Sequence, residues 1–213
     1  MLFIFDWDGT LIDSTERIIG AMQAAADDCG FEVCDAAAVR DIIGLGLPEA
    51  IATLYPALEP AHRDRLRQAY AERYVAADQQ PCRFFPGVFA TLAALKARGD
   101  TLAVATGKSR RGLDRVLAQL DMLEFFDATR CADETRSKPH PQMLDELLAE
   151  FASSADDAVM IGDTEYDMAM AKNAGMPRIA VDYGAHSVQR LLAYAPALVL
   201  SEFPRLLDWP AAH

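Results

Sequence analysis

Short apolar runs recur along this chain, and each of them ends in a polar or glycine-containing turn. None alternates cleanly between apolar and polar residues, which is typical of strands buried on both faces of a parallel sheet. Helical patterns lie between the runs, for example with apolar residues at i, i+3, i+4 and i+7 from Leu113 and again from Leu144. Alternating strands and helices from about residue 84 to 200 predict an α/β fold with a doubly wound parallel sheet. The predicted strands cover residues 2–5, 101–105, 127–131, 158–161 and 178–181.

The stretch after the first apolar run breaks this alternation, because residues 15–80 contain helical patterns and no strand candidate. Asp13 and Glu16 have the spacing of a capping box at the start of a helix, and Gly30 is suited to end that helix. A longer helix is predicted from Pro60 to about Asp78. So many helical residues exceed what a crossover between two strands needs. We therefore expect a core domain of residues 1–14 and 81–213, with an inserted all-α domain of residues 15–80. The residues that the longer helix should bury are Leu66, Tyr70 and Tyr74.

Charge and cysteine usage limit the partners and the compartment. Among 213 residues, 20 are Lys or Arg and 32 are Asp or Glu, so the formal net charge is −12. Such a surface repels nucleic acids and anionic lipids. The 4 cysteines show no metal-binding spacing and are expected to be free thiols in a reducing compartment. The apolar start of the chain is too short for a signal peptide, and no apolar run approaches the ~18 residues of a membrane span. We expect a cytoplasmic protein that binds neither nucleic acid nor membrane.

The first predicted strand leads directly into Asp6-Trp7-Asp8-Gly9-Thr10. In an open α/β sheet, ligands bind outside the carboxyl ends of the strands. Two carboxylates as close as Asp6 and Asp8 repel each other unless a cation lies between them. The pair suits a Mg²⁺ site, or a nucleophile beside a general acid, although Asp-Gly-Thr is also good turn chemistry. Trp7 is expected to pack beside this site.

The other predicted strands also end in residues that can take part in chemistry. Thr106-Gly107 follows the second strand, Lys138 comes after the third, and Asp163 and Asp167 follow the fourth. Singly, each has an ordinary structural explanation, such as a helix cap or a solvated lysine. Together they bring a hydroxyl, a cation and carboxylates to the edge of the sheet that carries Asp6.

In these motifs the sequence resembles the haloacid dehalogenase-like phosphatase superfamily, over essentially the whole chain. Its four motifs correspond to Asp6 through Thr10, to Thr106, to Lys138, and to Gly162-Asp163 with Asp167. The helical insert is similar to the small helical cap of that superfamily. Further similarity to its phosphoglycolate phosphatase-like branch lies in Asp13-Ser14, Phe85-Pro86-Gly87 and Ala174-Gly175.

The resemblance implies roles for the core residues. Asp6 would be the nucleophile that forms an aspartyl-phosphate, and Asp8 would act as general acid and then as general base. Mg²⁺ would be held by Asp6, the main-chain carbonyl of Asp8 and Asp163, with Asp167 acting through water or behind these ligands. Lys138 and Mg²⁺ would offset the repulsion between the phosphate and Asp6.

The resemblance also implies residues that bind the substrate. A phosphoryl oxygen would be bound by Thr106 and by the amide of Gly107. Arg40 in the cap suits a substrate carboxylate, but an ordinary position on a helix surface is an equally good explanation. The remaining residues assigned to substrate or phosphate binding are Thr10, Gly44 and Lys108.

The function implied is a Mg²⁺-dependent phosphatase that hydrolyses a small organic phosphomonoester, as phosphoglycolate phosphatases do. The partner would be a small phosphorylated metabolite, and the protein a monomer or homodimer. Inorganic pyrophosphatase and sugar- or nucleotide-phosphatase activities stay open, because cap residues decide between them. A β-phosphoglucomutase-like phosphomutase stays open as well, because it differs in the lifetime of the aspartyl-phosphate, which the sequence does not show. A true dehalogenase would lack the second aspartate of the first motif, which is present here as Asp8.

Overall fold

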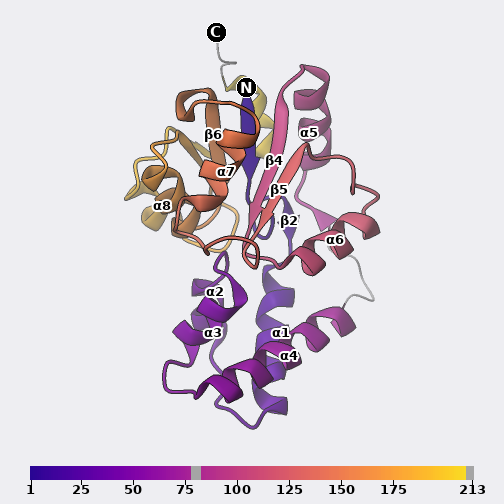
Figure 1. Cartoon of the computed structure of the whole chain (residues 1–213), viewed down its shortest axis with the longest axis vertical. Coiled ribbons are helices and arrows are strands. Elements are labelled where there is room, and N and C mark those ends of the chain that lie inside the picture. Colours follow the sequence, from indigo (N-terminus) through magenta and orange to yellow (C-terminus); the bar gives the residue numbers. More distant parts are fainter. Residues whose placement is uncertain (78–82, 210–213) are drawn as a thin grey trace.

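A central parallel sheet organises the computed structural model, which describes residues 1–77 and 83–209 (Figure 1). Its strand order is β5-β4-β1-β6-β7-β8. The first strand, β1, lies in the middle and pairs with both β4 and β6. The strands are β1 (Leu2–Phe5), β4 (Thr101–Thr106), β5 (Ala128–Cys131), β6 (Ala158–Gly162), β7 (Arg178–Val181) and β8 (Leu198–Leu200).

The sequence prediction of buried parallel strands is confirmed, with boundaries that differ by no more than one residue. Every residue of β1 and of β6 is buried, which explains why neither strand alternates between apolar and polar residues. The sixth strand, β8, was not among the five predicted strands. It stands at one edge of the sheet and is only partly buried, so its apolar pattern is weaker.

Helices cover both faces of the sheet, as a doubly wound fold requires. Phe3 and Phe5 pack on one face against α5 (Val88–Ala97), α6 (Arg110–Gln119) and the 3₁₀ helix η3 (Phe203–Asp208). Leu2 and Ile4 pack on the other face against α7 (Gln142–Glu150) and α8 (Glu165–Asn173). In Figure 1 these two sets of helices lie on opposite sides of the strands. The remaining elements are the 3₁₀ helix η2 (Ala155–Asp157) and α9 (Val188–Leu192).

The helical insert, which we call the cap, has an apolar core of its own. Met22, Val39, Ile51 and Leu66 are buried together there. The cap lies beyond the carboxyl ends of the strands, below the sheet in Figure 1. Leu66 and Tyr74 are buried as predicted, whereas Tyr70 is only half-buried. The helices are α1 (Thr15–Asp28), α2 (Ala36–Asp41), α3 (Leu47–Leu54) and α4 (Pro60–Ala76). The predicted helix end at Asp78 and the start of the linker at Pro81 lie outside the described residues.

The two chain segments that connect core and cap form a small ribbon that the sequence did not predict. Strand β2 (Ile12–Asp13) pairs antiparallel with β3 (Arg83–Phe84). The predicted capping box of Asp13 and Glu16 is wrong, because Asp13 belongs to β2 and Ser14 is the N-cap of α1. Ser14 makes no side-chain cap and instead donates from Oγ to Asp8 Oδ1 at 2.6 Å. In the part of the chain that the structure describes, no helix is long and apolar enough to span a bilayer.

Candidate active site

The carboxyl ends of the central strands bring the predicted motif residues together. Asp6 directly follows β1, Thr106 ends β4, and Asp163 directly follows β6. Lys138 reaches the same place from the loop before α7, and Asp167 from the first turn of α8. All five side chains are buried. The sheet edge therefore gathers residues that are far apart in the sequence.

Lys138 is the cation of this cluster. Its Nζ donates to Asp6 Oδ1 at 2.6 Å and to Asp167 Oδ1 at 2.7 Å, and its side chain is 0% exposed. Burial lowers the pKa of Lys138, but the carboxylates of Asp167 and Asp6 outweigh that effect and raise it. The lysine stays protonated and holds two of the acidic side chains in place.

Asp163 and Asp167 also make hydrogen bonds with groups other than Lys138. Asp163 accepts from Thr10 Oγ1 and from the main-chain amide of Ala185, both at 2.7 Å. Asp167 forms a capping box with Thr164 at the start of α8. Thr10 thus lies in the cluster, where its hydroxyl donates a hydrogen bond to Asp163.

Three buried carboxylates against one ammonium leave negative charge uncompensated. The side chains of Asp6, Asp163 and Asp167 offer oxygen atoms that lie within 4.8 Å of one another. Burial raises the pKa of Asp6 well above its usual value, and the neighbouring Asp167 and Asp163 add to this effect against Lys138. Burial and Asp167 likewise raise the pKa of Asp163 to about 7. A divalent cation among these oxygens would remove the repulsion.

One atom in the cluster supports such a cation directly. Asp6 Oδ2 is buried and accepts no hydrogen bond from any described residue. Burying a carboxylate oxygen without a hydrogen-bond donor costs free energy. A hard metal ion bound to this oxygen would take the place of the missing donor. The donor set therefore fits Mg²⁺.

Asp8 faces away from the carboxylate cluster, toward the cap. Its Oδ1 accepts from Ser14, and Lys108 Nζ lies 3.0 Å from the same oxygen. Lys108 also donates to the hydroxyl of Tyr74 on cap helix α4 at 3.1 Å. Burial lowers the pKa of Lys108, but Asp8 and the nearby tyrosines outweigh this effect, so the pKa is raised. Asp8 is thus connected to the cap through one charged side chain.

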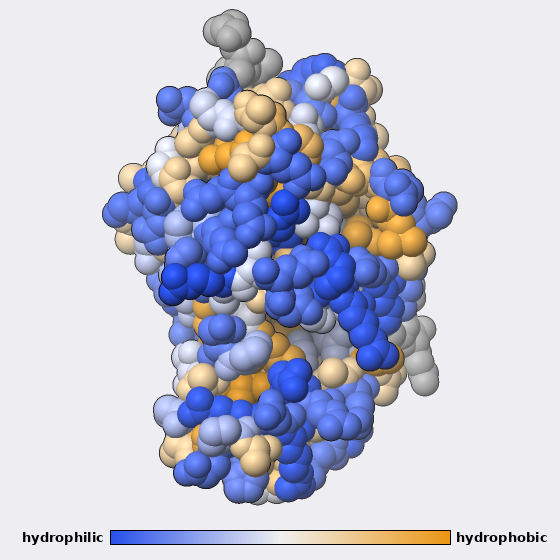
Figure 2. Space-filling view, in the orientation of Figure 1, coloured by the Kyte–Doolittle hydropathy of each residue, from blue (hydrophilic) through white to orange (hydrophobic). Residues whose placement is uncertain are grey.

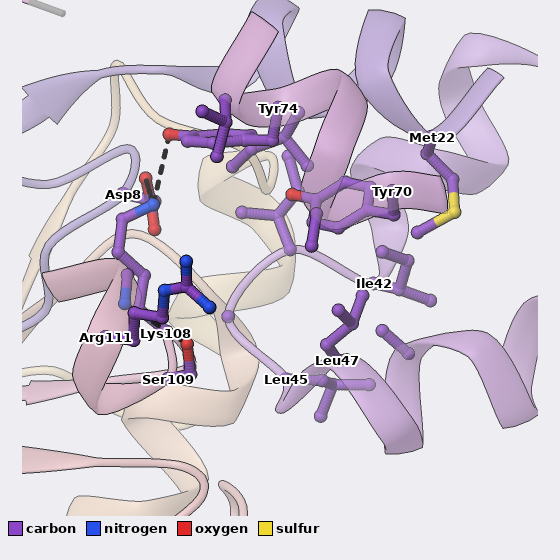
Figure 3. Close-up of a pocket in the computed structure, with 18 of the residues that line it drawn as sticks. Asp8, Met22, Ile42, Leu45, Leu47, Tyr70, Tyr74, Lys108, Ser109 and Arg111 are labelled. Atoms are coloured by element: carbon purple, nitrogen blue, oxygen red, sulfur yellow. Dashed lines mark hydrogen bonds and ion pairs between the residues drawn. The ribbon is translucent and has the colours of Figure 1, made fainter. Parts of the chain in front are cut away.

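A cavity of about 710 Å³ opens between core and cap and reaches Asp6 and Asp8. Gly107 and Lys108 contribute to its core wall, and Gly44 to its cap wall. Figure 2 shows a hollow at the waist of the molecule, where core and cap meet, with hydrophobic residues inside it. In Figure 3 the charged and polar residues gather around Asp8, while apolar side chains of the cap form the far wall.

Two glycines let the cap loop approach the core closely. A Cβ atom on Gly107 would lie 2.5 Å from the carbonyl oxygen of Leu45. Gly44 has a φ of +100°, and a Cβ atom there would lie 3.0 Å from Thr164 Oγ1. The amide of Gly46 donates to Ser137 Oγ at 2.7 Å. The cap loop is therefore seated on the core at several points.

Two of the positions considered in the sequence, Arg40 and Trp7, do not line the cavity. Arg40 does not line the cavity; it pairs with Glu16 at 2.6 Å, with its side chain 44% exposed. The ordinary surface position thus describes Arg40 in this structure. Trp7 is 1% exposed and packs edge-on against Phe84 and Phe126, as the packing interpretation predicts.

The sequence did not predict a group of hydrogen bonds and ion pairs that joins the core to the cap at Asp41. The carbonyl oxygen of Asp41, the last residue of α2, accepts from Tyr166 Oη at 2.9 Å and lies 3.1 Å from His186 Nε2. The carboxylate of Asp41 pairs with Arg190, which also pairs with Glu165. His186 lies in a loop but is only 3% exposed. None of these residues belongs to a motif, so no sequence signal marked them.

Comparison with known proteins places the chain in a family. Residues 3–181 match the model of the haloacid dehalogenase-like hydrolases. A "Probable phosphatase IndB" of Dickeya dadantii is 35% identical, with 100% of this chain and 93% of that protein covered. A "Phosphoglycolate phosphatase" of Vibrio cholerae is 32% identical, with 97% and 95% covered. A haloacid dehalogenase-like family hydrolase from Streptococcus pneumoniae superposes with a TM-score of 0.84 at 25% identity, covering 98% of this chain and 97% of that one. The chain is an enzyme of the haloacid dehalogenase-like hydrolase family and belongs to its phosphoglycolate phosphatase-like branch.

Proposed function

We propose that this enzyme is a Mg²⁺-dependent phosphatase that hydrolyses small organic phosphomonoesters through an aspartyl-phosphate on Asp6. The observation that carries the proposal is the buried group of Asp6, Asp163 and Asp167, with Lys138 bridging two of them and Asp6 Oδ2 left without a partner. The names of the relatives from Dickeya dadantii and Vibrio cholerae agree with phosphatase activity.

In this proposal Asp6 attacks phosphorus and displaces the alcohol of the substrate. Its carboxylate is at the end of the cavity, so a phosphoryl group that enters from the cap side meets it. Lys138 keeps Asp6 oriented and supplies positive charge as phosphate approaches. Thr106 and the amide of Gly107 are the proposed donors to a phosphoryl oxygen, and Lys108 lines the cavity beside Gly107.

Asp8 is the proposed general acid and base. Protonated, it would give a proton to the leaving alcohol; ionised, it would take one from the water that hydrolyses the aspartyl-phosphate. Ser14 and Lys108 hold its carboxylate at the cavity, where both groups pass. The hydrogen bond from Ser14 and the positive charge of Lys108 would keep the side chain of Asp8 in one orientation during both proton transfers.

Mg²⁺ would be held by Asp6, Asp163 and the main-chain carbonyl of Asp8, with Asp167 supporting it through water or through Lys138. Bound there, the ion would neutralise charge on the phosphoryl group and on the carboxylates. Thr10 and Ala185 keep Asp163 in place for this role.

The test is phosphatase activity on simple alkyl phosphates with Mg²⁺ and with chelator, in wild type and in two variants. Asp6→Asn is expected to lose turnover and the acid-stable phosphoenzyme trapped by rapid quenching. Asp8→Asn should slow the reaction about 10²–10⁴-fold, as loss of a general acid does. Asp156→Asn, at an exposed aspartate of η2, is the matched control and should resemble wild type. Full activity in chelator, or phosphorylation of Asp6→Asn protein, would overturn the proposal.

The chain would be organised around this site. Residues 1–14 and 81–213 would form the catalytic core, and residues 15–80 a cap domain that covers the site. Cytoplasmic location is supported by the free thiols of Cys29, Cys34 and Cys131, since such thiols are typical of a reducing compartment. A monomer and a homodimer are both compatible with a site built by one chain.

A further inference from the structure

The cap side of the cavity differs in chemistry from the core side. The core side carries charge, because Lys108, Arg111 and Arg115 line it together with Asp6 and Asp8. On the cap side, Figure 3 shows a wall of aliphatic, thioether and aromatic side chains. They come from α1, from the loop between α2 and α3, and from α3 and α4. The labelled members of this wall are Met22, Ile42, Leu45, Leu47 and Tyr70.

The cap wall also lacks a positive charge. Among the described residues that line the cavity, the cap contributes no lysine, arginine or histidine. Arg40, which suited a substrate carboxylate, is paired with Glu16 outside the cavity. The positive side chains that line the cavity, Lys108, Arg111 and Arg115, all belong to the core side. A second anionic group that extended to the cap wall would therefore lie against apolar side chains, on a wall that the acidic Glu72 also lines, and burying a charge without a partner is costly.

The size of the cavity points in the same direction. At about 710 Å³ it falls among pockets that enclose ligands the size of a drug molecule. A two-carbon ester such as phosphoglycolate would leave most of it filled with water in contact with apolar walls. An organic group that covers those walls would remove this contact, which is favourable.

One polar atom on the cap wall has no partner. The hydroxyl of Tyr70 makes no hydrogen bond to any residue in the described parts of the chain, although its ring lies tilted beside that of Tyr74, with the two centroids 5.9 Å apart. Burial raises the pKa of Tyr70, so the hydroxyl stays protonated and can donate. Tyr70 thus offers a ring face and one donor, but no charge.

From these observations we infer that the substrate is a phosphomonoester with an apolar or aromatic body, uncharged apart from its phosphoryl group, rather than phosphoglycolate. The inference rests on the proposed function, because it assumes that the phosphoryl group occupies the core end at Asp6. The body then lies against Met22, Leu47 and Tyr70 of the cap.

The first experiment compares esters with the same type of leaving group. Ethyl phosphate, 2-phenylethyl phosphate and phosphoglycolate are all esters of primary alcohols, so the chemical step is closely matched. With wild-type enzyme and Mg²⁺, kcat/KM for 2-phenylethyl phosphate is expected to exceed that for ethyl phosphate by about 10- to 100-fold, the value of burying one phenyl ring. Phosphoglycolate should be the poorest of the three. Turnover with phosphoglycolate preferred would overturn the inference and leave the proposed function intact, whereas no turnover of any ester would overturn the proposed function.

A pair of cap variants tests where the organic body binds. Leu47→Asp puts a carboxylate into the cavity wall at the first residue of α3, where a helix tolerates negative charge. Val33→Asp makes the same kind of change at a cap residue that is 46% exposed and does not line the cavity. The preference for 2-phenylethyl over ethyl phosphate should fall at least about 10-fold in Leu47→Asp and stay at the wild-type value in Val33→Asp. Equal preference in both variants would contradict the inference.

A binding measurement needs no variant. Calorimetry of wild-type enzyme with Mg²⁺ should show that 2-phenylethylphosphonate binds about 10- to 100-fold more tightly than ethylphosphonate. The heat capacity change should be more negative for the larger ligand, as burial of apolar surface requires. Equal affinities would overturn the inference even if Leu47→Asp fails to fold.

Discussion

Replacement of Lys138 by methionine tests the charge balance of the site. Methionine keeps the length and much of the volume of the side chain but removes the ammonium. In the wild type that ammonium lies 2.6 Å from Asp6 Oδ1 and 2.7 Å from Asp167 Oδ1, with the lysine side chain 0% exposed. The variant leaves both carboxylates in a buried position without their cation.

The structure sets the size of the effect. Removing one partner of a buried ion pair costs about 3–5 kcal/mol of unfolding free energy, and here one cation serves two carboxylates, which favours the upper end. For a chain of this size, about 1 kcal/mol corresponds to roughly 2–4 °C in Tm, so the variant should unfold roughly 6–20 °C below wild type. Mg²⁺ should return part of this loss, because it supplies positive charge among the same oxygens.

Thermal unfolding followed by circular dichroism, in chelator and in Mg²⁺, measures both effects. Lys172→Met is the control, since Lys172 is exposed in the last turn of α8 and should cost no more than about 1 kcal/mol. The double variant Lys138→Met/Asp167→Asn should regain stability relative to Lys138→Met, because it removes one uncompensated carboxylate. Equal Tm values for Lys138→Met and Lys172→Met in chelator would refute this reasoning.

Four other perturbations give further expected outcomes. Trp7→Ala should cost about 3–5 kcal/mol in denaturant unfolding, because the ring is 1% exposed; a loss below about 1 kcal/mol would contradict its role in packing. Gly107→Ala should lower kcat/KM by up to about 10²-fold, since the new Cβ displaces the cap loop; unchanged kinetics would speak against the close approach. Burial holds the pKa of His186 below its usual 6.5, beside Arg190, Asp41 and Glu165, so the unfolded chain takes up the proton first and stability is lost as pH falls below 6.5. The Tm of His186→Gln should therefore fall less than that of wild type between pH 7 and 5, and parallel curves would rule this out. Replacing residues 16–79 by a Gly/Ser linker should leave a folded core whose kcat/KM for small phosphates drops by orders of magnitude; wild-type preference in that protein would show that the core selects the substrate.

The sheet and the acidic cluster could be predicted from the sequence because each depends on local signals. A strand buried on both faces is a continuous apolar run, and the residues that follow such runs must meet at one edge of a parallel sheet. Asp6 and Asp163 are of this kind, whereas Lys138 reaches the same edge from the loop between β5 and α7.

Contacts between core and cap could not be predicted, because they depend on how two separately formed parts meet. Nothing near Asp41 in the sequence indicates Arg190, and nothing near Lys108 indicates Tyr74. Ser14 illustrates a different failure. It is the N-cap residue of α1, where a serine hydroxyl usually accepts from a helix amide, but here the hydroxyl donates to Asp8 instead.

The central place of β1 has a consequence for the synthesis of the chain. This strand is synthesised before its neighbours β4 and β6, which begin at Thr101 and Ala158, so it has no pairing partner until they have been made. The cap follows β1 directly and can bury its own apolar residues during this time. Until β4 emerges, the four apolar residues of β1 stay unpaired, and an unpaired apolar strand is a site for aggregation. Nascent chains stalled before residue 101 are therefore expected to need a chaperone, whereas chains stalled well beyond residue 162 are not.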